Sequence, residues 1–510
     1  MRPQRAAALA GVVAVVVALG TGELLAGLVA AVPSPLDAVG QVLIPRFPGA
    51  ITTWAIDTFG TANRAVLLGA IVLVALALGA VAGMAARNGP ATPVTLFVAA
   101  GILGIVAAQG QPGAGLLAVV AATAIAAASG LAALRWSLVR ASEARVHDPS
   151  GGDVVSRRTV LGTLGALAAA AVGAGGVGRW ALGGGVTVEP VDVALPTPRT
   201  TRPPVTAAVD ASSQVDGLSP IITPTDRFFR IDTALSVPRV DPEAWRLRIT
   251  GMVDRPVELT LDELFDAPMD EVDVTIACVS NEVGGDLIGT ARWLGTPLAD
   301  LLDRAGVRPD ATQVVGRSVD GWTAGFPTEL AFARRDAIVA VGMNGEPLPA
   351  RHGFPARLIV PGLYGYVSAT KWLAEIELTS WEGFDAYWIP RGWAKEGPIK
   401  TASRIDVPRA RQRVTTGEVT VAGVAWAPTT GIEAVEVQVD DGPFQPATLV
   451  EPLADTTWVQ WVMAVELAEG EHALTVRAVD GDRRLQPRGP QPPAPDGAEG
   501  WHRRVVRVAT

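Results

Sequence analysis

The chain has 510 residues, enough for two or three domains, and 49% of them are hydrophobic. Its mean hydropathy of +0.31 is too high for a purely soluble protein. The formal net charge of −9 argues against nucleic acid as a partner, because nucleic-acid binding requires a basic surface.

Five long apolar runs occupy the N-terminal part of the chain. A bilayer requires about 20 residues of apolar helix, with about 17 to 25 tolerated, so four runs qualify and the third is marginal without its flanking residues. Glu23 is the only charged residue inside them, whereas the helices of a soluble bundle would carry a polar stripe. We therefore predict a transmembrane region over residues 1–183, with spans in 9–32, 65–86, 94–108, 113–134 and 159–177.

Glu23 has two interpretations, because a carboxylate inside a membrane is costly. It either contacts a proton path or a quinone, or it is hydrogen-bonded and neutral at a helix interface. We favour the second interpretation.

The arginines predict the orientation of these spans. Positive residues accumulate on the cytoplasmic side of a membrane. If all five runs span, eight arginines fall on one side and three on the other. The N-terminus is then cytoplasmic, and the chain after about residue 183 lies outside, in a multi-pass protein of the plasma membrane. The first group is Arg2, Arg5, Arg87, Arg135, Arg140, Arg145, Arg157 and Arg158, and the second is Arg46, Arg64 and Arg179.

The fifth run begins with Ser156-Arg157-Arg158-Thr159 and continues as an uncharged stretch rich in Ala and Gly. This start resembles a twin-arginine signal, which exports proteins that have already folded around a cofactor. Two arginines can equally anchor the cytoplasmic end of a helix, and both interpretations remain open.

Composition and periodicity divide the remainder into three parts. Residues 184–219 form a Pro-rich linker without an apolar face. Residues 220–403 mix short alternating strands with a few helical patterns, which is typical of an α+β domain. Residues 404–510 contain only alternating segments separated by turns, which predicts an immunoglobulin-like β-sandwich without its disulfide.

Cys278 is the only cysteine of the chain. Outside the cytoplasm a single thiol cannot form an intramolecular disulfide, so it is either a small buried hydrophobe or a reactive or metal-binding thiolate. It follows the strand-like stretch 272–276 and precedes the polar segment ending in Gly284-Gly285. A strand-to-turn junction places a side chain at the end of a sheet, where ligands usually bind.

Several segments after residue 220 form a distinctive series. They are Phe228-Phe-Arg230, Cys278-Val-Ser-Asn281, Trp293-Leu-Gly295, Met343-Asn-Gly-Glu-Pro-Leu-Pro349, His352-Gly-Phe-Pro-Ala-Arg357, Val360-Pro-Gly362 and Lys371-Trp-Leu373. In their order and spacing over about 150 residues they resemble the sulfite oxidase family of molybdenum–pterin enzymes, in a membrane-anchored bacterial form. The resemblance implies a molybdopterin-binding catalytic domain followed by an immunoglobulin-like, dimerisation-type domain, and oxygen-atom transfer at molybdenum.

The resemblance also implies a cofactor site for molybdenum-molybdopterin. Molybdenum favours soft sulfur donors, and by position the protein ligand is Cys278, with Asn281 in the same motif. The anionic end of the pterin requires fixed positive charge, for which His352, Arg357 and Lys371 are the candidates. Each of the three also has an ordinary structural interpretation, as a turn cap, a partner of a surface carboxylate or a side chain extended along Trp372.

On the substrate side the resemblance points to Arg230 and, less specifically, to Tyr387. Sulfite-oxidising members carry an arginine shortly after the Cys-x-x-Asn motif, whereas Glu282-Val283 follows here. A basic residue after Val-Pro-Gly is also missing, and Tyr364 lies in that region. The substrate is therefore an oxoanion or, slightly favoured, an S-oxide or N-oxide such as oxidised methionine in a protein. A cofactor-free membrane binding module is the third alternative.

Such a reaction requires a redox partner that delivers or removes electrons. None of the four histidines falls within an apolar run, and the chain has no cysteine cluster. We therefore expect the membrane region to be an anchor or docking platform, with a separate electron-transfer partner. The sandwich makes a homodimer possible.

Overall fold

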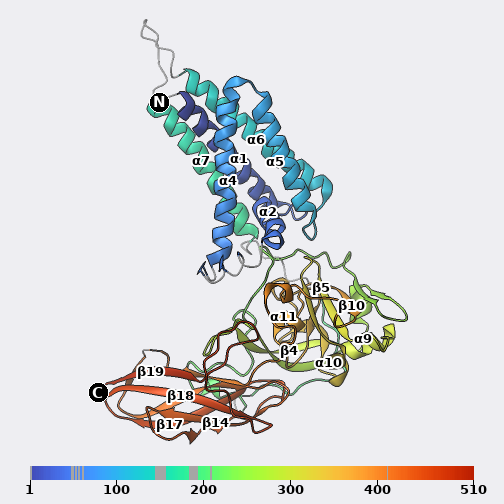
Figure 1. Cartoon of the computed structure of the whole chain (residues 1–510), viewed down its shortest axis with the longest axis vertical. Helices are drawn as coiled ribbons and strands as arrows, with labels where there is room; N and C mark the ends of the chain where they lie inside the picture. Colours follow the sequence, from blue (N-terminus) through green and yellow to red (C-terminus); the bar gives the residue numbers. More distant parts are fainter. Residues whose placement is uncertain are drawn as a thin grey trace. The chain divides into compact units, whose positions relative to one another are not determined.

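The computed structural model describes residues 3–47, 51, 54–55, 58–59, 62–143, 157–182, 193–206, 209–410 and 412–509. The chain forms two compact units. The first comprises Met1–Pro190 and Asp232–Asp241, and the second comprises Val191–Ile231 and Pro242–Thr510. Figure 1 labels the elements of both.

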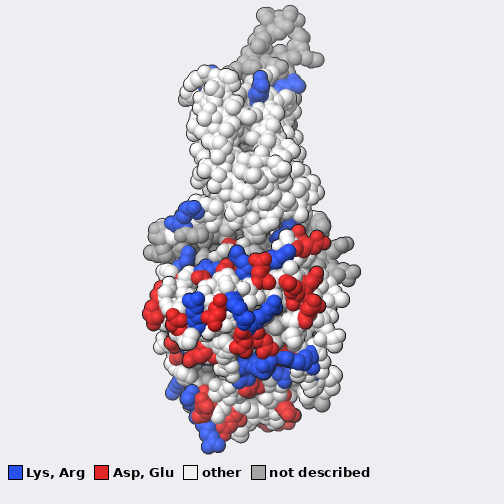
Figure 2. Space-filling model, turned by 90° about the vertical axis from the view of Figure 1, so that its right-hand side faces the viewer, with Lys and Arg blue, Asp and Glu red and all other residues white. Residues whose placement is uncertain are grey.

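The first unit is a bundle of helices. Within the described residues, five of its helices are long and apolar enough to cross a membrane, which confirms the number predicted from the apolar runs. Their outer faces are apolar too, with Leu73 68% and Leu117 85% exposed, as expected for surfaces that contact lipid. On the face shown in Figure 2, the bundle carries almost no charge between its ends, whereas the second unit carries both signs. The helices are α1 (Pro3–Leu28), α2 (Pro35–Leu43), α4 (Asn63–Ala85), α5 (Ala91–Gln109), α6 (Leu116–Glu143) and α7 (Arg157–Trp180).

Glycines bring α1 and α4 together. A Cβ atom on Gly11 would lie 1.9 Å from the carbonyl oxygen of Gly79, and one on Gly83 would lie 2.0 Å from that of Ala7. Small residues allow such close approach of helix backbones in membranes, where there is little hydrophobic force between helices.

A polar cluster joins α1, α2 and α7 inside this unit. Ser34, the N-cap of α2, donates its hydroxyl hydrogen to Glu23 Oε1 at 2.8 Å. Arg179 lies 3.3 Å from Glu23 Oε2 and 3.2 Å from Asp37 Oδ1. Glu23 is therefore hydrogen-bonded at a helix interface, as expected, but as one member of an ion pair. Arg179, which the sequence places just beyond the apolar run 159–177, belongs to α7 and to this cluster.

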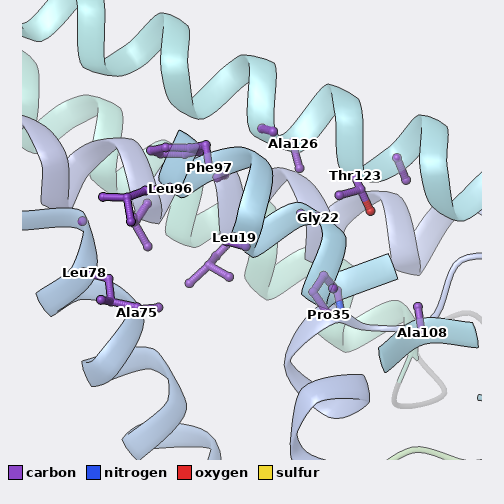
Figure 3. A pocket seen from close by; sticks show the side chains of 18 of the residues that line it. Leu19, Gly22, Pro35, Ala75, Leu78, Leu96, Phe97, Ala108, Thr123 and Ala126 are labelled. Atoms are coloured by element: carbon purple, nitrogen blue, oxygen red, sulfur yellow. The ribbon is translucent and has the colours of Figure 1, made fainter. Parts of the chain in front are cut away.

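An apolar pocket of about 240 Å³ lies between α1, α4, α5 and α6 (Figure 3). Leu19, Leu78, Leu96 and Phe97 contribute to its walls, and Thr123 supplies a hydroxyl.

The α+β part of the second unit contains two β-sheets. The first has the order β3-β4-β7-β8, with β9 paired to β7, and the second has the order β2-β1-β10-β5-β6. Four short helices connect these strands, so the α+β prediction is confirmed. The first sheet comprises β3 (Asp270–Ala277), β4 (Ile288–Pro297), β7 (Ile338–Met343), β8 (Glu346–Pro347) and β9 (Arg357–Ile359). The second comprises β1 (Leu247–Gly251), β2 (Val257–Leu259), β5 (Gln313–Ser318), β6 (Thr323–Pro327) and β10 (Leu373–Thr379). The helices are α8 (Leu261–Phe265), α9 (Leu298–Ala305), α10 (Thr328–Ala333) and α11 (Gly365–Ser368).

The C-terminal part of this unit is a two-sheet sandwich, as predicted. Its sheets have the orders β11-β13-β17-β16 and β12-β19-β18-β14-β15, and both contribute to one core that includes Val421, Trp461, Leu474 and Val506. Alternating apolar residues face this core, which is the pattern that the sequence displayed. The strands are β11 (Ala402–Val407), β12 (Arg413–Thr415), β13 (Gly417–Trp426), β14 (Ile432–Val439), β15 (Gln445–Pro446), β16 (Thr448–Leu449), β17 (Val459–Leu467), β18 (Gly470–Asp480) and β19 (His502–Ala509).

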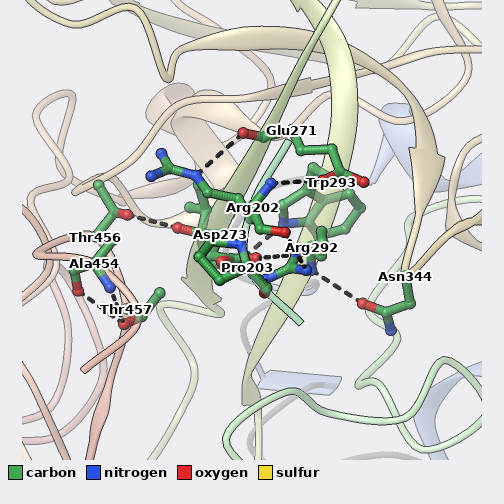
Figure 4. A network of polar contacts seen from close by, with 11 residues as sticks. Arg202, Pro203, Glu271, Asp273, Arg292, Trp293, Asn344, Ala454, Thr456 and Thr457 are labelled. Carbon is green, nitrogen blue, oxygen red and sulfur yellow. Dashed lines mark hydrogen bonds and ion pairs between the residues drawn. The ribbon is translucent and has the colours of Figure 1, made fainter. Parts of the chain in front are cut away.

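The outer edge of β3 is covered from two directions. Glu271 donates its backbone N–H to the carbonyl of Thr200 at 2.9 Å, and Thr275 donates to that of Thr456 at 3.0 Å. The first partner lies in the segment predicted as a Pro-rich linker, and the second lies in the sandwich. Covering the edge satisfies backbone groups that would otherwise be exposed. Figure 4 shows the surrounding polar contacts, including the hydrogen bond from Thr456 to the Asp273 carbonyl.

Candidate functional site

Cys278 is the first residue after β3, at the end of a sheet, where the sequence pattern places it. Its N–H donates to the carbonyl of Leu287 at 2.9 Å, and its own carbonyl accepts from the N–H of Asn281 at 3.0 Å. The side chain of Asn281 accepts from the N–H of Leu287 at 2.9 Å. These bonds close the base of a loop, residues 278–287, which we call the cysteine loop.

Burial raises the pKa of the Cys278 thiol, while hydrogen bonds from Ser280 and the positive charge of Lys371 act in the opposite direction. The free thiol is therefore protonated at neutral pH. A metal ion that binds it must displace this proton, as metals do at cysteine ligands.

The three predicted cationic candidates converge on one region of this unit. Arg357, on β9, donates from Nη1 to the backbone carbonyl of His352 at 3.0 Å. Lys371 packs against the turn after His352, because a Cβ on Gly353, at φ +115°, would lie 2.9 Å from the Lys371 Cβ. The ring of His352 lies edge-on to that of Phe228, with centroids 5.9 Å apart.

Positive charges surround the ring of His352. The pKa of His352 is lowered to about 4, first by burial and then by the charges of Arg357, Lys371 and Arg351. His352 is consequently neutral, with its Nε2 3.0 Å from the carbonyl oxygen of Thr225. Burial keeps His352 neutral, and the group of cations beside it is suited to bind an anion.

Arg230 lies beside this cationic group. Its neighbour Ile231 accepts a hydrogen bond from Lys371 Nζ at 3.1 Å, and its neighbour Phe229 stacks on Phe228. Arg230 is exposed, so its guanidinium is accessible to solvent.

Tyr387 lies in a different environment. Its backbone N–H donates to Thr323 Oγ1 at 3.0 Å, and its ring contacts Trp388 and the guanidinium of Arg391, whose centre is 3.8 Å from the ring centroid. A different tyrosine, Tyr364, lines one small cavity with Ala277 and Asn281 on either side of Cys278, and its pKa is raised to about 12 mainly by burial. The sequence signal for Tyr364 was its position two residues after Val360-Pro-Gly362, in the region where a basic residue was expected.

Acidification is expected to destabilise this unit between about pH 6.5 and 4. Burial lowers the pKa of both His352 and His502 to about 4, from the usual 6.5. The folded protein therefore keeps both rings neutral, while the unfolded chain takes up protons as the pH falls through 6.5. Each neutral histidine contributes fully to the free energy of unfolding above pH 6.5. This contribution, about 3 kcal/mol for each histidine, is lost as the pH falls toward 4.

Thermal unfolding of the full chain at pH 7, 6 and 5 would measure this loss. The variant His502→Gln should flatten the pH dependence. A melting temperature that is constant across this range would contradict the expectation.

Comparisons with known proteins match the same region. Residues 234–388 match the family model "Oxidoreductase molybdopterin binding domain". The chain is 30% identical to the mitochondrial sulfite oxidase of Homo sapiens over 315 residues, covering 52% of this chain and 57% of that protein. It is also 30% identical to the sulfite oxidase of Gallus gallus over 322 residues, covering 52% of this chain and 68% of the relative.

The second unit has a counterpart among solved structures. The crystal structure of the sulfane dehydrogenase SoxCD from Paracoccus pantotrophus superposes with a TM-score of 0.50 at 20% identity, covering 64% of this chain and 95% of that one. This similarity shows a shared fold. The chain spans little more than half the length of the mammalian relatives that it matches.

Proposed function

The chain belongs to the sulfite oxidase family of molybdopterin oxidoreductases, and we propose that it transfers oxygen atoms at molybdenum on the outer face of a membrane. The observation that carries the proposal is the cationic group, in which Lys371 packs against the turn after His352 and Arg357 binds the His352 carbonyl. The positive charge of Lys371 acts to lower the pKa of both the His352 ring and the Cys278 thiol. A metal–pterin cofactor with an anionic tail requires such a combination of a soft sulfur and an anion-binding region.

The residues present fit molybdopterin. Cys278 offers a thiol that can become the soft thiolate ligand. Arg357, Lys371 and the neutral ring of His352 can hold the anionic end of the pterin, and Gly353 leaves the turn beside Lys371 without a side chain. When bound, the cofactor would supply a metal that cycles between states two electrons apart, together with its own sulfur donors.

The protein side of the reaction then consists of binding and orientation. We assign Cys278 to the metal and Asn281 to the shape of the cysteine loop. Arg230 and Tyr387 remain the proposed substrate contacts, the former because it adjoins the cationic group. Tyr364, which lines a cavity with Ala277 and Asn281, joins them as a candidate.

A neutral S-oxide or N-oxide is the slightly favoured substrate class, because the arginine that sulfite-oxidising relatives carry after Cys-x-x-Asn is replaced. Glu282 and Val283 occupy this part of the loop, and both are exposed. A carboxylate at this position repels an oxoanion but does not repel a neutral oxide.

Steady-state assays are expected to show poor turnover of sulfite and better turnover of neutral S-oxides with an artificial reductant. The kcat/KM for a neutral S-oxide is expected to exceed that for sulfite by about tenfold or more, since one lost charged hydrogen bond costs about 1.5 to 3 kcal/mol. The matched variant Val283→Arg should raise the kcat/KM for sulfite. Efficient oxidation of micromolar sulfite by the wild-type protein would contradict this substrate assignment.

The outer location is supported by the five apolar helices and by the arginine bias of the loops. A twin-arginine route would fit a protein that is exported with its cofactor. Helix α7 begins at Arg157, while Ser156, Arg145 and the side chains of Arg157 and Arg158 lie outside the described part of the chain.

Reporter fusions test on which side of the membrane the segments that follow the spans lie. A fusion after Arg145 is expected to be cytoplasmic, and a fusion after Gln214 is expected to be outside. A cytoplasmic signal from the second fusion would overturn both the orientation and the proposed export.

A separate electron carrier and a homodimer through the sandwich complete the proposal. The cofactor-free alternative makes a different prediction, namely that the purified protein contains no molybdenum. Elemental analysis of the full chain distinguishes the two.

A further inference from the structure

The tip of the cysteine loop is held by the C-terminal sandwich. The hydrogen bonds that close its base leave Glu282–Asp286 without a partner strand inside the catalytic sheet. Two sandwich residues contact the tip, Arg404 on β11 and His502 on β19. They are far from the loop in sequence, since Arg404 lies 119 positions after Gly285.

Arg404 fixes the carbonyl group of Gly285. Its Nη1 donates to this oxygen at 2.7 Å. The same guanidinium donates from Nε to Asp406 Oδ1 at 2.7 Å and from Nη2 to Ser219 Oγ at 2.8 Å. The side chain is only 9% exposed. Because three separate acceptors fix the planar guanidinium, Arg404 holds the loop in one place.

His502 packs directly against Gly284. Its Nδ1 accepts the N–H of Ile405 at 2.9 Å, so the neutral ring carries its proton on Nε2. A Cβ atom on Gly284 would lie 2.5 Å from both Cδ2 and Nε2 of this ring. Gly284 also has φ +77°, a conformation that favours glycine. The loop therefore fits the ring only because it has no side chain there.

The interface around these contacts leaves little free space. A cavity of about 20 Å³ is lined by Asn281 and Val283 of the loop, by Tyr364 and by Ser403 and Trp426 of the sandwich. This volume has room for about one water molecule. The loop cannot move toward the sandwich without a clash, and it cannot move away without losing the bond to Arg404.

We propose that Arg404 and His502 are positioning residues for the metal ligand, which fix Gly284 and Gly285 so that the cysteine loop presents Sγ of Cys278 to the metal. The sandwich, expected only to support dimerisation, then also helps to position the metal ligand. The inference relies on the proposed function for the identity of the metal, but not for the positioning itself.

The single cysteine gives a direct test that needs no cofactor. The full chain is purified from cells that cannot make molybdopterin, and the rate at which a maleimide alkylates Cys278 is measured. Arg404→Gln and His502→Ala are each expected to raise this rate about tenfold, because local opening of the loop exposes the thiol. Arg404→Lys should give an intermediate rate, since it keeps the charge but loses the fork of donors. The control Arg483→Gln alters an exposed sandwich arginine and should leave the rate unchanged.

A spectroscopic measurement addresses the same point in the cofactor-loaded protein. X-ray absorption at molybdenum should show one fewer sulfur ligand in a fraction of the His502→Ala molecules, and the sulfur-to-metal absorption band should weaken. Alkylation at the wild-type rate in His502→Ala and Arg404→Gln, with unchanged melting temperatures, would overturn the proposal. If Arg404→Gln does not fold, His502→Ala decides alone. If the wild-type protein binds no molybdenum, the proposed function fails, while the alkylation rates still decide the positioning role.

Discussion

Cys278→Ser is expected to abolish oxygen-atom transfer while leaving part of the cofactor bound. Serine replaces a soft thiolate by a hard and weakly acidic hydroxyl, so the metal loses the donor that tunes its redox states. The anionic end of the pterin would still be held by Arg357 and Lys371, so cofactor content should fall only partly. Activity per bound molybdenum should fall more than about a hundredfold, because even residues that only support a ligand change activity about 10- to 100-fold.

A buried cysteine without a metal role would respond differently. Serine at such a position costs roughly 1 to 3 kcal/mol of stability through an unsatisfied hydroxyl, but the activity of each folded molecule is kept. The measurement is therefore activity normalised to bound molybdenum in the purified variant. A value close to wild type would remove Cys278 as the ligand.

Arg292→Ala is expected to lower the unfolding free energy of the second unit by about 3 to 5 kcal/mol, because it leaves a buried carboxylate without its partner. Arg292 on β4 lies opposite Asp273 on β3 and binds both of its carboxylate oxygens, at 2.9 and 3.0 Å (Figure 4). The Asp273 side chain is only 2% exposed. Arg292 Nη2 also donates to the carbonyl of Pro203 at 2.9 Å, so the same side chain ties the preceding segment to the sheet.

The melting temperature of the full chain measures this loss, with an expected decrease of roughly 10 °C. The double variant Asp273→Leu with Arg292→Met should recover much of the stability, because it removes both buried charges together. Arg483→Ala is the matched control, since its pair with Glu433 is largely exposed and should change stability by less than about 1 kcal/mol. A loss as large in Arg483→Ala as in Arg292→Ala would contradict the role of burial.

Local patterns were sufficient for the main elements of the fold. A membrane span is recognisable from about 20 contiguous apolar residues, and α5, marginal as the run 94–108, reaches 19 residues once its flanks are included. Strand alternation predicted the sandwich, since one face of each sheet must be buried. The short helix α2 was not predicted. It has only nine residues after its N-cap Ser34, which is too short for a recognisable periodic signal.

The candidate site was predictable where its residues are close in sequence. Cys278 and Asn281 belong to one turn, and His352 and Arg357 are five residues apart, so their association requires only local geometry. The structure also brings Lys371 to this group. Tyr387 was expected at the substrate side, whereas Tyr364 lines a cavity with Ala277 and Asn281, which flank Cys278 in sequence. Which tyrosine contacts substrate remains a prediction.

By itself, the sequence determined the five apolar helices, the order of an α+β domain and a sandwich, and the position of the single cysteine at the end of a strand. Each of these depends on contiguous residues, whose burial and backbone preferences act locally. Only the tertiary structure decided that Thr200 and Thr456 cover the edge of β3, that Arg179 pairs with Glu23, and that Arg404 and His502 hold the cysteine loop. These contacts join residues more than 60 positions apart. They form because packed elements bring unsatisfied polar groups together, and no local pattern specifies which distant group will be the partner.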